Sequence, residues 1–152
     1  MSWSGRVESI NVATGAAGAG SAIETRESAR LVADQGVEGD RYFGRSEPER
    51  VLTLIEAEAI EAVARDYDLT LSAGEARRNI VTRGVPLNHL VGREFTIGSV
   101  RLRGTGLSEP CEHLEELTQP GVRVALQHRG GLRAAIVEGG EIRVGDAVET
   151  GS

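Results

Sequence analysis

The sequence predicts a mainly β protein: a closed or strongly curved β-barrel with one longer helix and short helical turns. Short apolar runs recur about every ten residues, and only one segment shows a long helical periodicity. Glycine accounts for 20 of the 152 residues, which indicates many tight turns between short elements. We therefore expect a single domain over residues 1–152, in which the helices cover the openings of the barrel.

The first half of the chain supplies three strands and the longer helix. Alternation or apolar runs of strand length place the strands at 6–12, 31–33 and 51–55. Apolar residues then recur at helical spacing from Ala59 to Tyr67, so a helix is expected to end at Asp68. The segment Thr53–Glu56 has the pattern of a capping box at the start of that helix.

The second half consists mostly of short strands. Strands are expected at 79–83, 93–97, 100–103, 132–138, 141–144 and 147–150. The pairs Gly98-Ser99 and Gly139-Gly140 have the composition of two-residue hairpin turns between such strands. Short helical turns are expected at 111–117 and 122–128. The turn-rich segment 34–41 contains Gly36 and Gly39, which permit positive φ angles.

Composition excludes several functions. All 17 basic residues are arginine, so the chain has no lysine for a P-loop or for a Schiff base with pyridoxal phosphate. The net charge of −6 and the absence of a basic stripe argue against a nucleic-acid partner. No segment approaches the roughly 20 apolar residues needed to span a bilayer, and no signal peptide pattern is present. We expect a cytoplasmic protein with no membrane association.

The single cysteine, Cys111, is the first candidate for chemistry. It cannot form an internal disulfide or a Cys-x-x-Cys motif. Pro110 is typical of a first helical turn, where free backbone N–H groups stabilise a thiolate, whereas Glu109 and Glu112 oppose ionisation. The residues alone leave two readings open, a nucleophile or metal ligand and a buried inert thiol.

Arginines near glycines form a second candidate, a site for phosphate or another oxyanion. Guanidinium groups bind such anions in a bidentate manner, and glycines let backbone N–H groups approach the same ligand. The arginines concerned are Arg41, Arg77, Arg78, Arg129 and Arg133. For any one of them, a surface salt bridge is the alternative. The glycines of residues 15–20 have the wrong spacing for a dinucleotide-binding loop and indicate a surface loop.

Five short motifs, taken in order and spacing, resemble the MOSC domain family, which is named for the C-terminal domain of eukaryotic molybdenum cofactor sulfurases. The resemblance covers about residues 7–148. The motifs are Gly36–Arg41, Gly74–Ile80, Pro110-Cys111, Arg129–Gly131 and Gly139–Asp146.

The resemblance implies a β-barrel with a cleft that binds molybdenum cofactor (molybdopterin). The family's cysteine falls on Cys111, as catalytic thiol and metal ligand. The implied cofactor-binding positions are Gly39, Asp40, Arg41, Arg78, Asn79 and Arg129, and the arginine set above adds Arg133. Glu112-His113 follows the cysteine where many relatives have a second cysteine, so a dithiol mechanism is excluded.

Three hypotheses follow from the residues and the resemblance together. In the leading one, the chain binds molybdenum cofactor or carries sulfur, with Cys111 as metal ligand or persulfide carrier. In the second, it is a molybdenum-dependent reductase component for N-hydroxylated compounds. In the third, it is a scaffold with a structural Cys111. The first implies a sulfur donor such as a cysteine desulfurase, and the second implies an electron-transfer protein, because this chain has no iron–sulfur motif or flavin fold.

Overall fold

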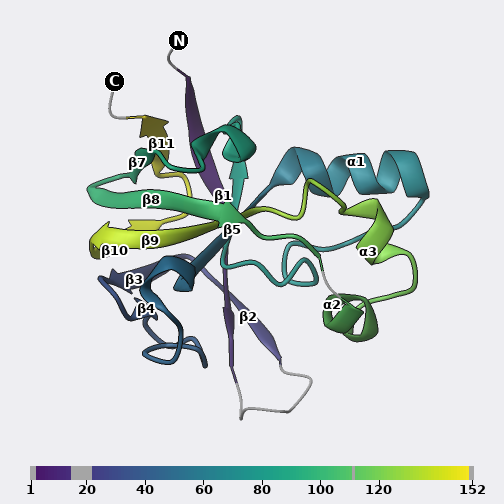
Figure 1. Cartoon of the computed structure of the whole chain (residues 1–152), viewed down its shortest axis with the longest axis horizontal. Coiled ribbons are helices and arrows are strands. Elements are labelled where there is room, and N and C mark those ends of the chain that lie inside the picture. The colour runs from purple at the N-terminus through teal and green to yellow at the C-terminus, as the bar shows by residue number, and fades with distance from the viewer. Residues whose placement is uncertain (1–2, 15–21, 111, 151–152) are drawn as a thin grey trace.

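A closed ring of strands forms the centre of the molecule (Figure 1). The structure is a computed structural model that describes residues 3–14, 22–110 and 112–150. Within these residues, the ring contains β1 (Ser4–Ala13), β11 (Ala147–Thr150), β7 (Glu94–Ile97), β8 (Val100–Leu107), β9 (Leu132–Glu138), β5 (Leu52–Glu56) and β6 (Ile80–Arg83), in that order. Only β5 and β6 pair in parallel. The predicted barrel is confirmed.

Strand β1 belongs to the barrel along one half and leaves it along the other. Residues 4–6 pair with β11, residues 6–10 pair with β6, and residues 10–13 pair with β2 (Ile23–Arg26). Ile10 and Val12 face the barrel core, so Asn11 and Ala13, which alternate with them, face outward. The barrel wall therefore continues into a two-stranded extension that has a polar outer face.

The helices pack on the outside of the barrel. They are α1 (Ala57–Tyr67), α2 (Glu112–Leu117) and α3 (Val122–Ala125), which Figure 1 shows gathered on one side. Ile55 and Val81 project from the outer faces of β5 and β6 into a second apolar cluster with helix residues such as Val63. The expectation that these helices cover the barrel openings is therefore wrong. Among the described residues of the helices, only those of the 3₁₀ helix η2 (Leu87–Leu90) add side chains to the barrel core.

The predicted capping box at the start of α1 is also wrong. Glu56 occupies the N-cap position without a side-chain hydrogen bond, because β5 continues through it up to the helix. Thr53 lies within β5, and its hydroxyl is hydrogen-bonded to Asn79 instead. The predicted end of the helix is confirmed, since Asp68 is the C-cap in the left-handed region.

The Gly98-Ser99 hairpin is confirmed, whereas the Gly139-Gly140 hairpin is wrong. Ile97 and Val100 pair across the first turn. After β9, however, β10 (Gly140–Arg143) pairs with β3 (Ser28–Val32), which also pairs with β4 (Gly36–Val37). The second sheet has the order β10-β3-β4. A glycine pair marks a turn but does not determine which strand the chain joins afterwards.

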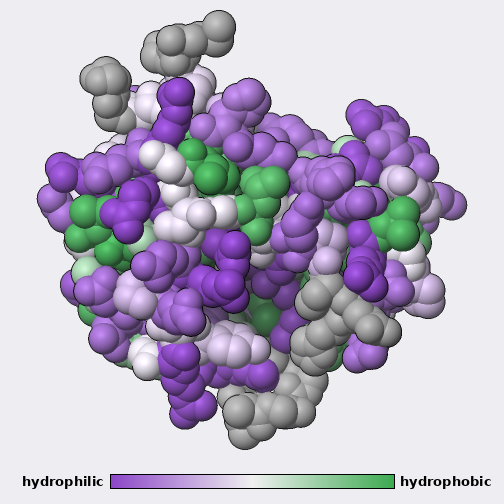
Figure 2. All heavy atoms as spheres, in the orientation of Figure 1, coloured by the Kyte–Doolittle hydropathy of each residue, from purple (hydrophilic) through white to green (hydrophobic). Residues whose placement is uncertain are grey.

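The surface drawn in Figure 2 is mostly hydrophilic, with apolar residues in separate small patches and a hollow below the centre of the view. In the described residues, no helix combines the length and the apolar character that crossing a bilayer requires.

Gly131 is required where the chain enters β9. Its φ is +117°, and a Cβ there would lie 2.0 Å from the carbonyl oxygen of Leu54. The neighbouring Gly130 is similarly crowded, since its Cβ would lie 2.5 Å from the carbonyl oxygen of Ser108. The Arg129–Gly131 motif therefore allows the backbone to pass close to β5 and to the end of β8.

Replacing Gly131 with alanine should destabilise the fold by about 3 kcal/mol, because a left-handed conformation and a backbone clash add together. Urea denaturation measures the change. Gly92→Ala is the matched control, since its φ is +78° and no atom lies within 4 Å of the added Cβ. The control should lose only about 1 kcal/mol. Equal losses in the two variants would contradict the role of backbone crowding at Leu54.

Candidate functional site

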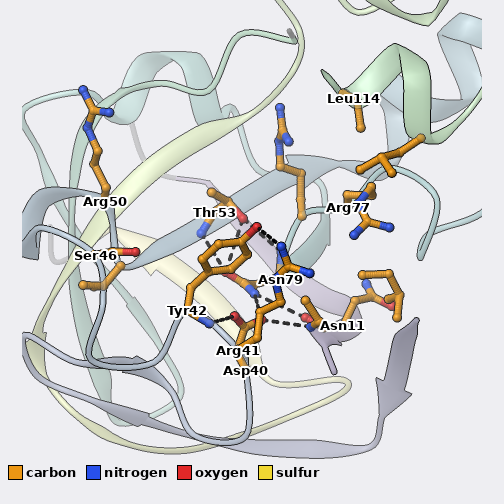
Figure 3. Close-up of a pocket in the computed structure, with 15 residues that line it drawn as sticks. Asn11, Asp40, Arg41, Tyr42, Ser46, Arg50, Thr53, Arg77, Asn79 and Leu114 are labelled. Carbon is orange, nitrogen blue, oxygen red and sulfur yellow. Dashed lines mark hydrogen bonds between the residues drawn. The ribbon is translucent and has the colours of Figure 1, made fainter. Parts of the chain in front are cut away.

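A cavity of about 230 Å³ lies on the outer face of the barrel where β1 and β5 meet the segment after β4. Thr53 faces it because Leu52 and Leu54, on either side, face the barrel core. Its lining residues are Asn11, Ala13, Ile23, Asp40, Arg41, Tyr42, Ser46, Arg50, Val51, Thr53, Arg77, Arg78, Asn79, Leu114 and Leu117 (Figure 3). The cavity thus brings together residues from separate parts of the sequence.

Asp40 is the central anion of the cavity wall, and its side chain is buried. Oδ2 accepts hydrogen bonds from the backbone N–H of Ala13 at 3.0 Å and from Nδ2 of Asn79 at 3.2 Å. Oδ1 accepts one from the backbone N–H of Tyr42 at 2.9 Å. The carboxylate therefore joins the end of β1, its own turn and the start of β6.

Asn79 has partners for both ends of its side-chain amide. Its Oδ1 accepts from the backbone N–H and the hydroxyl of Thr53, at 3.1 and 3.2 Å. Its Nδ2 donates to Asp40 and to the carbonyl oxygen of Asn11, the latter at 3.3 Å. One amide therefore connects β5, β1 and the Asp40 turn, and an isosteric aspartate at position 79 would have no donor for Asp40.

The turn that carries Asp40 also presents Arg41 and Tyr42. The predicted positive φ angles are confirmed at Gly36 and Gly39, at +113° and +92°. Gly39 does not line the cavity; a Cβ there would lie 2.6 Å from Nη1 of Arg26, so glycine lets that side chain pack against the turn. The Arg41 guanidinium lies 4.8 Å from the Tyr42 ring centroid and donates to the tyrosine hydroxyl at 3.0 Å.

The lining of the cavity carries a positive charge although the whole chain carries −6. Among the lining residues that the structure describes, four are arginines and Asp40 is the only carboxylate. Figure 3 shows Arg77 beside the polar cluster and Arg50 extending away from it. Guanidinium groups around a recess favour phosphate or another oxyanion. The arrangement is suited to binding an anionic ligand.

Arg78 also positions the loops beside the cavity. Its Nε donates to the carbonyl oxygen of Gly130 at 2.8 Å, and its Nη2 donates to that of Ser108 at 3.0 Å. Ser108 in turn donates its backbone N–H to Gly131. This arginine therefore fixes the chain entering the Pro110-Cys111 motif against the Arg129–Gly131 motif.

Arg129 and Arg133 do not line the cavity. Arg129 donates to the carbonyl oxygen of Ala125 and to Asp66 on α1. The hydrogen bond from Arg65, joined by that from Arg129, lowers the pKa of Asp66 to about 2. Arg133 pairs with Thr53 across β9 and β5, so the two side chains lie on the same face of the sheet. The Nε of Arg133 is buried and has no hydrogen-bond partner within the described residues.

Cys111 lies outside the described residues. Leu114 and Leu117 of α2, which follows it, line the cavity. In the described part of the chain, no group of three or more His, Cys, Asp or Glu side chains could hold a metal ion. Sequence reasoning missed Asn11, Thr53 and Tyr42 at this site. Only Tyr42 had a local signal, its place after the Gly36–Arg41 motif.

Asp40→Asn should destabilise the protein by about 2 kcal/mol, because the new amide has one acceptor oxygen where the carboxylate has two that face N–H donors. Thermal or urea unfolding measures the loss. Asp34→Asn removes the same charge at an exposed position and should change stability by less than about 0.5 kcal/mol. An Asp40→Asn variant as stable as Asp34→Asn would contradict the central place of this carboxylate.

Comparison with known proteins agrees with the architecture. The chain resembles the crystal structure of YUAD protein from Bacillus subtilis, with a TM-score of 0.83 and 16% identity over 98% of this chain and 96% of that one. It also resembles YiiM from Geobacillus stearothermophilus, with a TM-score of 0.75 and 15% identity over 97% and 75% of the two chains. YiiM from Escherichia coli matches with a TM-score of 0.69 and 20% identity over 97% and 70%.

These identities are low, so the likeness to solved structures establishes the fold alone. No curated protein matches the sequence. The sequence model of the MOSC domain, however, matches residues 38–149, which include the Asp40 turn, Asn79 and the Arg129–Gly131 motif. The resemblance inferred from the motifs is confirmed, and the chain belongs to the MOSC domain family.

Proposed function

We propose that this protein binds molybdenum cofactor in the arginine-lined cavity, with Cys111 as the protein ligand to the metal. The observation that carries the proposal is the cavity itself, which is cationic and built on the Asp40–Asn79 pair. Family membership supports the choice of cofactor. The cofactor, when bound, would supply redox chemistry at molybdenum.

The donor set fits the anionic part of the cofactor. Arg41 and Arg77 line the cavity and can hold a phosphate by charge-assisted hydrogen bonds. The volume of about 230 Å³ is smaller than the roughly 300–1,000 Å³ of typical ligand pockets. It therefore suits a phosphate with part of a ring, while the rest of the ligand lies outside.

The metal would depend on Cys111 rather than on a cluster of protein ligands. The described residues offer no such cluster, and a thiolate is a soft ligand of the kind that transition metals accept. Ser108, fixed by Arg78, and Leu114, in the cavity wall, are each three residues from Cys111. The positions of these two sequence neighbours support the choice of Cys111 as the proposed ligand. If the thiol instead carries persulfide sulfur, a cysteine desulfurase would be its donor.

Cys111→Ser should remove molybdenum while the arginines still retain pterin. Protein expressed in a host that makes the cofactor is measured by elemental analysis for molybdenum and by fluorescence of the oxidised pterin. The wild type should carry both. If the variant keeps both molybdenum and pterin, the result contradicts ligation by Cys111. Absence of both from the wild type, with cofactor synthesis verified, would contradict stable binding. Persulfide on Cys111 after incubation with a cysteine desulfurase and its sulfur source, L-cysteine, would then support sulfur carriage.

Arg41→Gln should weaken the binding of inorganic phosphate about tenfold, because one charge-assisted partner is removed. Isothermal titration calorimetry at low salt measures the affinity. Arg30→Gln makes the same charge change at an exposed position on β3 outside the cavity and should bind as the wild type does. Equal weakening in both variants would indicate a general effect of net charge and would contradict a phosphate site in the cavity.

A further inference from the structure

A second recess adjoins the arginine-lined cavity and differs from it in chemistry. This groove has a volume of about 510 Å³, and it shares Ile23, Arg77 and Leu117 with the first cavity. Its remaining lining residues are Ser9, Thr25, Ser72, Ala73, Gly74, Glu75 and Thr118. Arg77 is the only cation among the described residues of this lining. The two recesses together form a cleft with one cationic end and one end rich in oxygen atoms.

Three of the four hydroxyl groups in the described lining of the groove are committed as donors, and the fourth, that of Ser72, accepts from the backbone N–H of Glu75. Thr25 donates to Oδ1 of Asn11 at 2.9 Å, and Thr118 donates to the carbonyl oxygen of Leu114 at 2.7 Å. Ser9 exchanges hydrogen bonds with the same Asn11 side chain. A hydroxyl whose hydrogen is engaged still has oxygen lone pairs to offer. Away from Arg77, the described lining of the groove is therefore richer in acceptors than in donors, which favours a ligand that brings donors.

Glu75 supplies the charged acceptor of the groove. Its Oε1 accepts from the backbone N–H of Ser72 at 2.9 Å, and its own N–H donates to the Ser72 hydroxyl at 3.1 Å. This reciprocal pair holds the carboxylate at the groove wall and leaves Oε2 for a donor from a ligand. A held carboxylate binds two adjacent N–H groups more strongly than a hydroxyl does.

The boundary between the two recesses suits a flat ring. Ile23 and Leu117 provide apolar contact, and the planar guanidinium of Arg77 can stack on an aromatic face. Some rings carry a ring N–H beside an amino group on one edge. These two adjacent donors can bind the oxygen acceptors of the groove. Adenine and cytosine place an unprotonated ring nitrogen beside their amino group, which would face the Glu75 carboxylate unfavourably.

We propose that the groove recognises a 2-amino-4-oxopyrimidine edge whose linked phosphate lies in the arginine-lined cavity. Both a pterin and a guanine ring present this edge, with a ring N–H next to an amino group. The inference rests on the proposed anion cavity. It adds that the Glu75 carboxylate accepts hydrogen bonds from the ring edge and so determines which ring is bound. Thr25 and Ser9 are further acceptors along the same wall.

The test compares guanosine 5′-monophosphate with inosine 5′-monophosphate, which lacks only the amino group, and with inorganic phosphate. Calorimetry should show about tenfold tighter binding of the guanine nucleotide than of the inosine nucleotide, as expected for one charge-assisted contact. Glu75→Gln should abolish that preference and leave phosphate binding unchanged. Glutamine keeps an oxygen for the Ser72 N–H, so the local turn is preserved. Glu27→Gln, an equal charge change at an exposed position outside both recesses, should retain the preference.

The outcomes separate the two proposals. Equal binding of both nucleotides, or an unchanged preference in Glu75→Gln, would overturn the inference about the groove while phosphate binding still supports the cavity. Failure of phosphate and both nucleotides to bind would overturn the anion cavity and this inference with it. Competition by 6-hydroxymethylpterin or by guanosine then identifies which ring system the groove prefers.

Discussion

The contact between Asp40 and Asn79 is the interaction on which the cavity depends. A buried carboxylate loses its hydration, so it is stable only when donors replace the lost water molecules. Here those donors come from the end of β1, from the turn itself and from the residue before β6. Because Asn79 also binds Thr53 on β5, a single polar pair fixes the relative positions of β1, β5, the Asp40 turn and the start of β6 in the cavity wall.

Positive charge in the cavity follows from that arrangement. Arg41 follows Asp40 directly, and its backbone N–H donates to the carbonyl oxygen of Ala13. Arg77 and Arg78 directly precede Asn79, so fixing the asparagine also brings two guanidinium groups to the cavity. The chain is acidic overall, and the local field at the recess nevertheless has the opposite sign. An anion would thus meet a site that differs from the surrounding surface.

The strands could be predicted well because their signal is local. Alternation in β1 and the apolar runs of β5 and β9 depend on neighbours within a few residues, and the structure agrees with them. Thr53 shows the limit of this reasoning. Its pattern with Glu56 is typical of a helix cap, yet its hydroxyl binds Asn79, a partner 26 residues away that local spacing does not reveal. The partner of β10 was missed for the same reason.

The grouping of residues at the cavity was predicted in part, and through the motifs rather than through spacing. Asp40, Arg41, Arg78 and Asn79 lie together as the family resemblance implies. Arg129 belongs to the same set of motifs but binds Asp66, because α1 packs beside the loop that carries it. Thr53 and Asn11 carry no chemical signature in the sequence. They contribute to the cavity because the alternation of side chains along β5 and β1 makes them face outward, on the side where the Asp40 turn packs against the barrel.

The pairing of β1 with β11 has a consequence for synthesis on the ribosome. The ring cannot close until residues 147–150 have emerged, because β11 alone bridges β1 and β7. Until then both of those strands expose unpaired backbone edges, the kind of surface that recruits other nascent chains. The cavity-bearing end of β1 pairs with β2, which follows it directly in the sequence. The nascent polypeptide can therefore assemble one side of the cavity well before its barrel is complete.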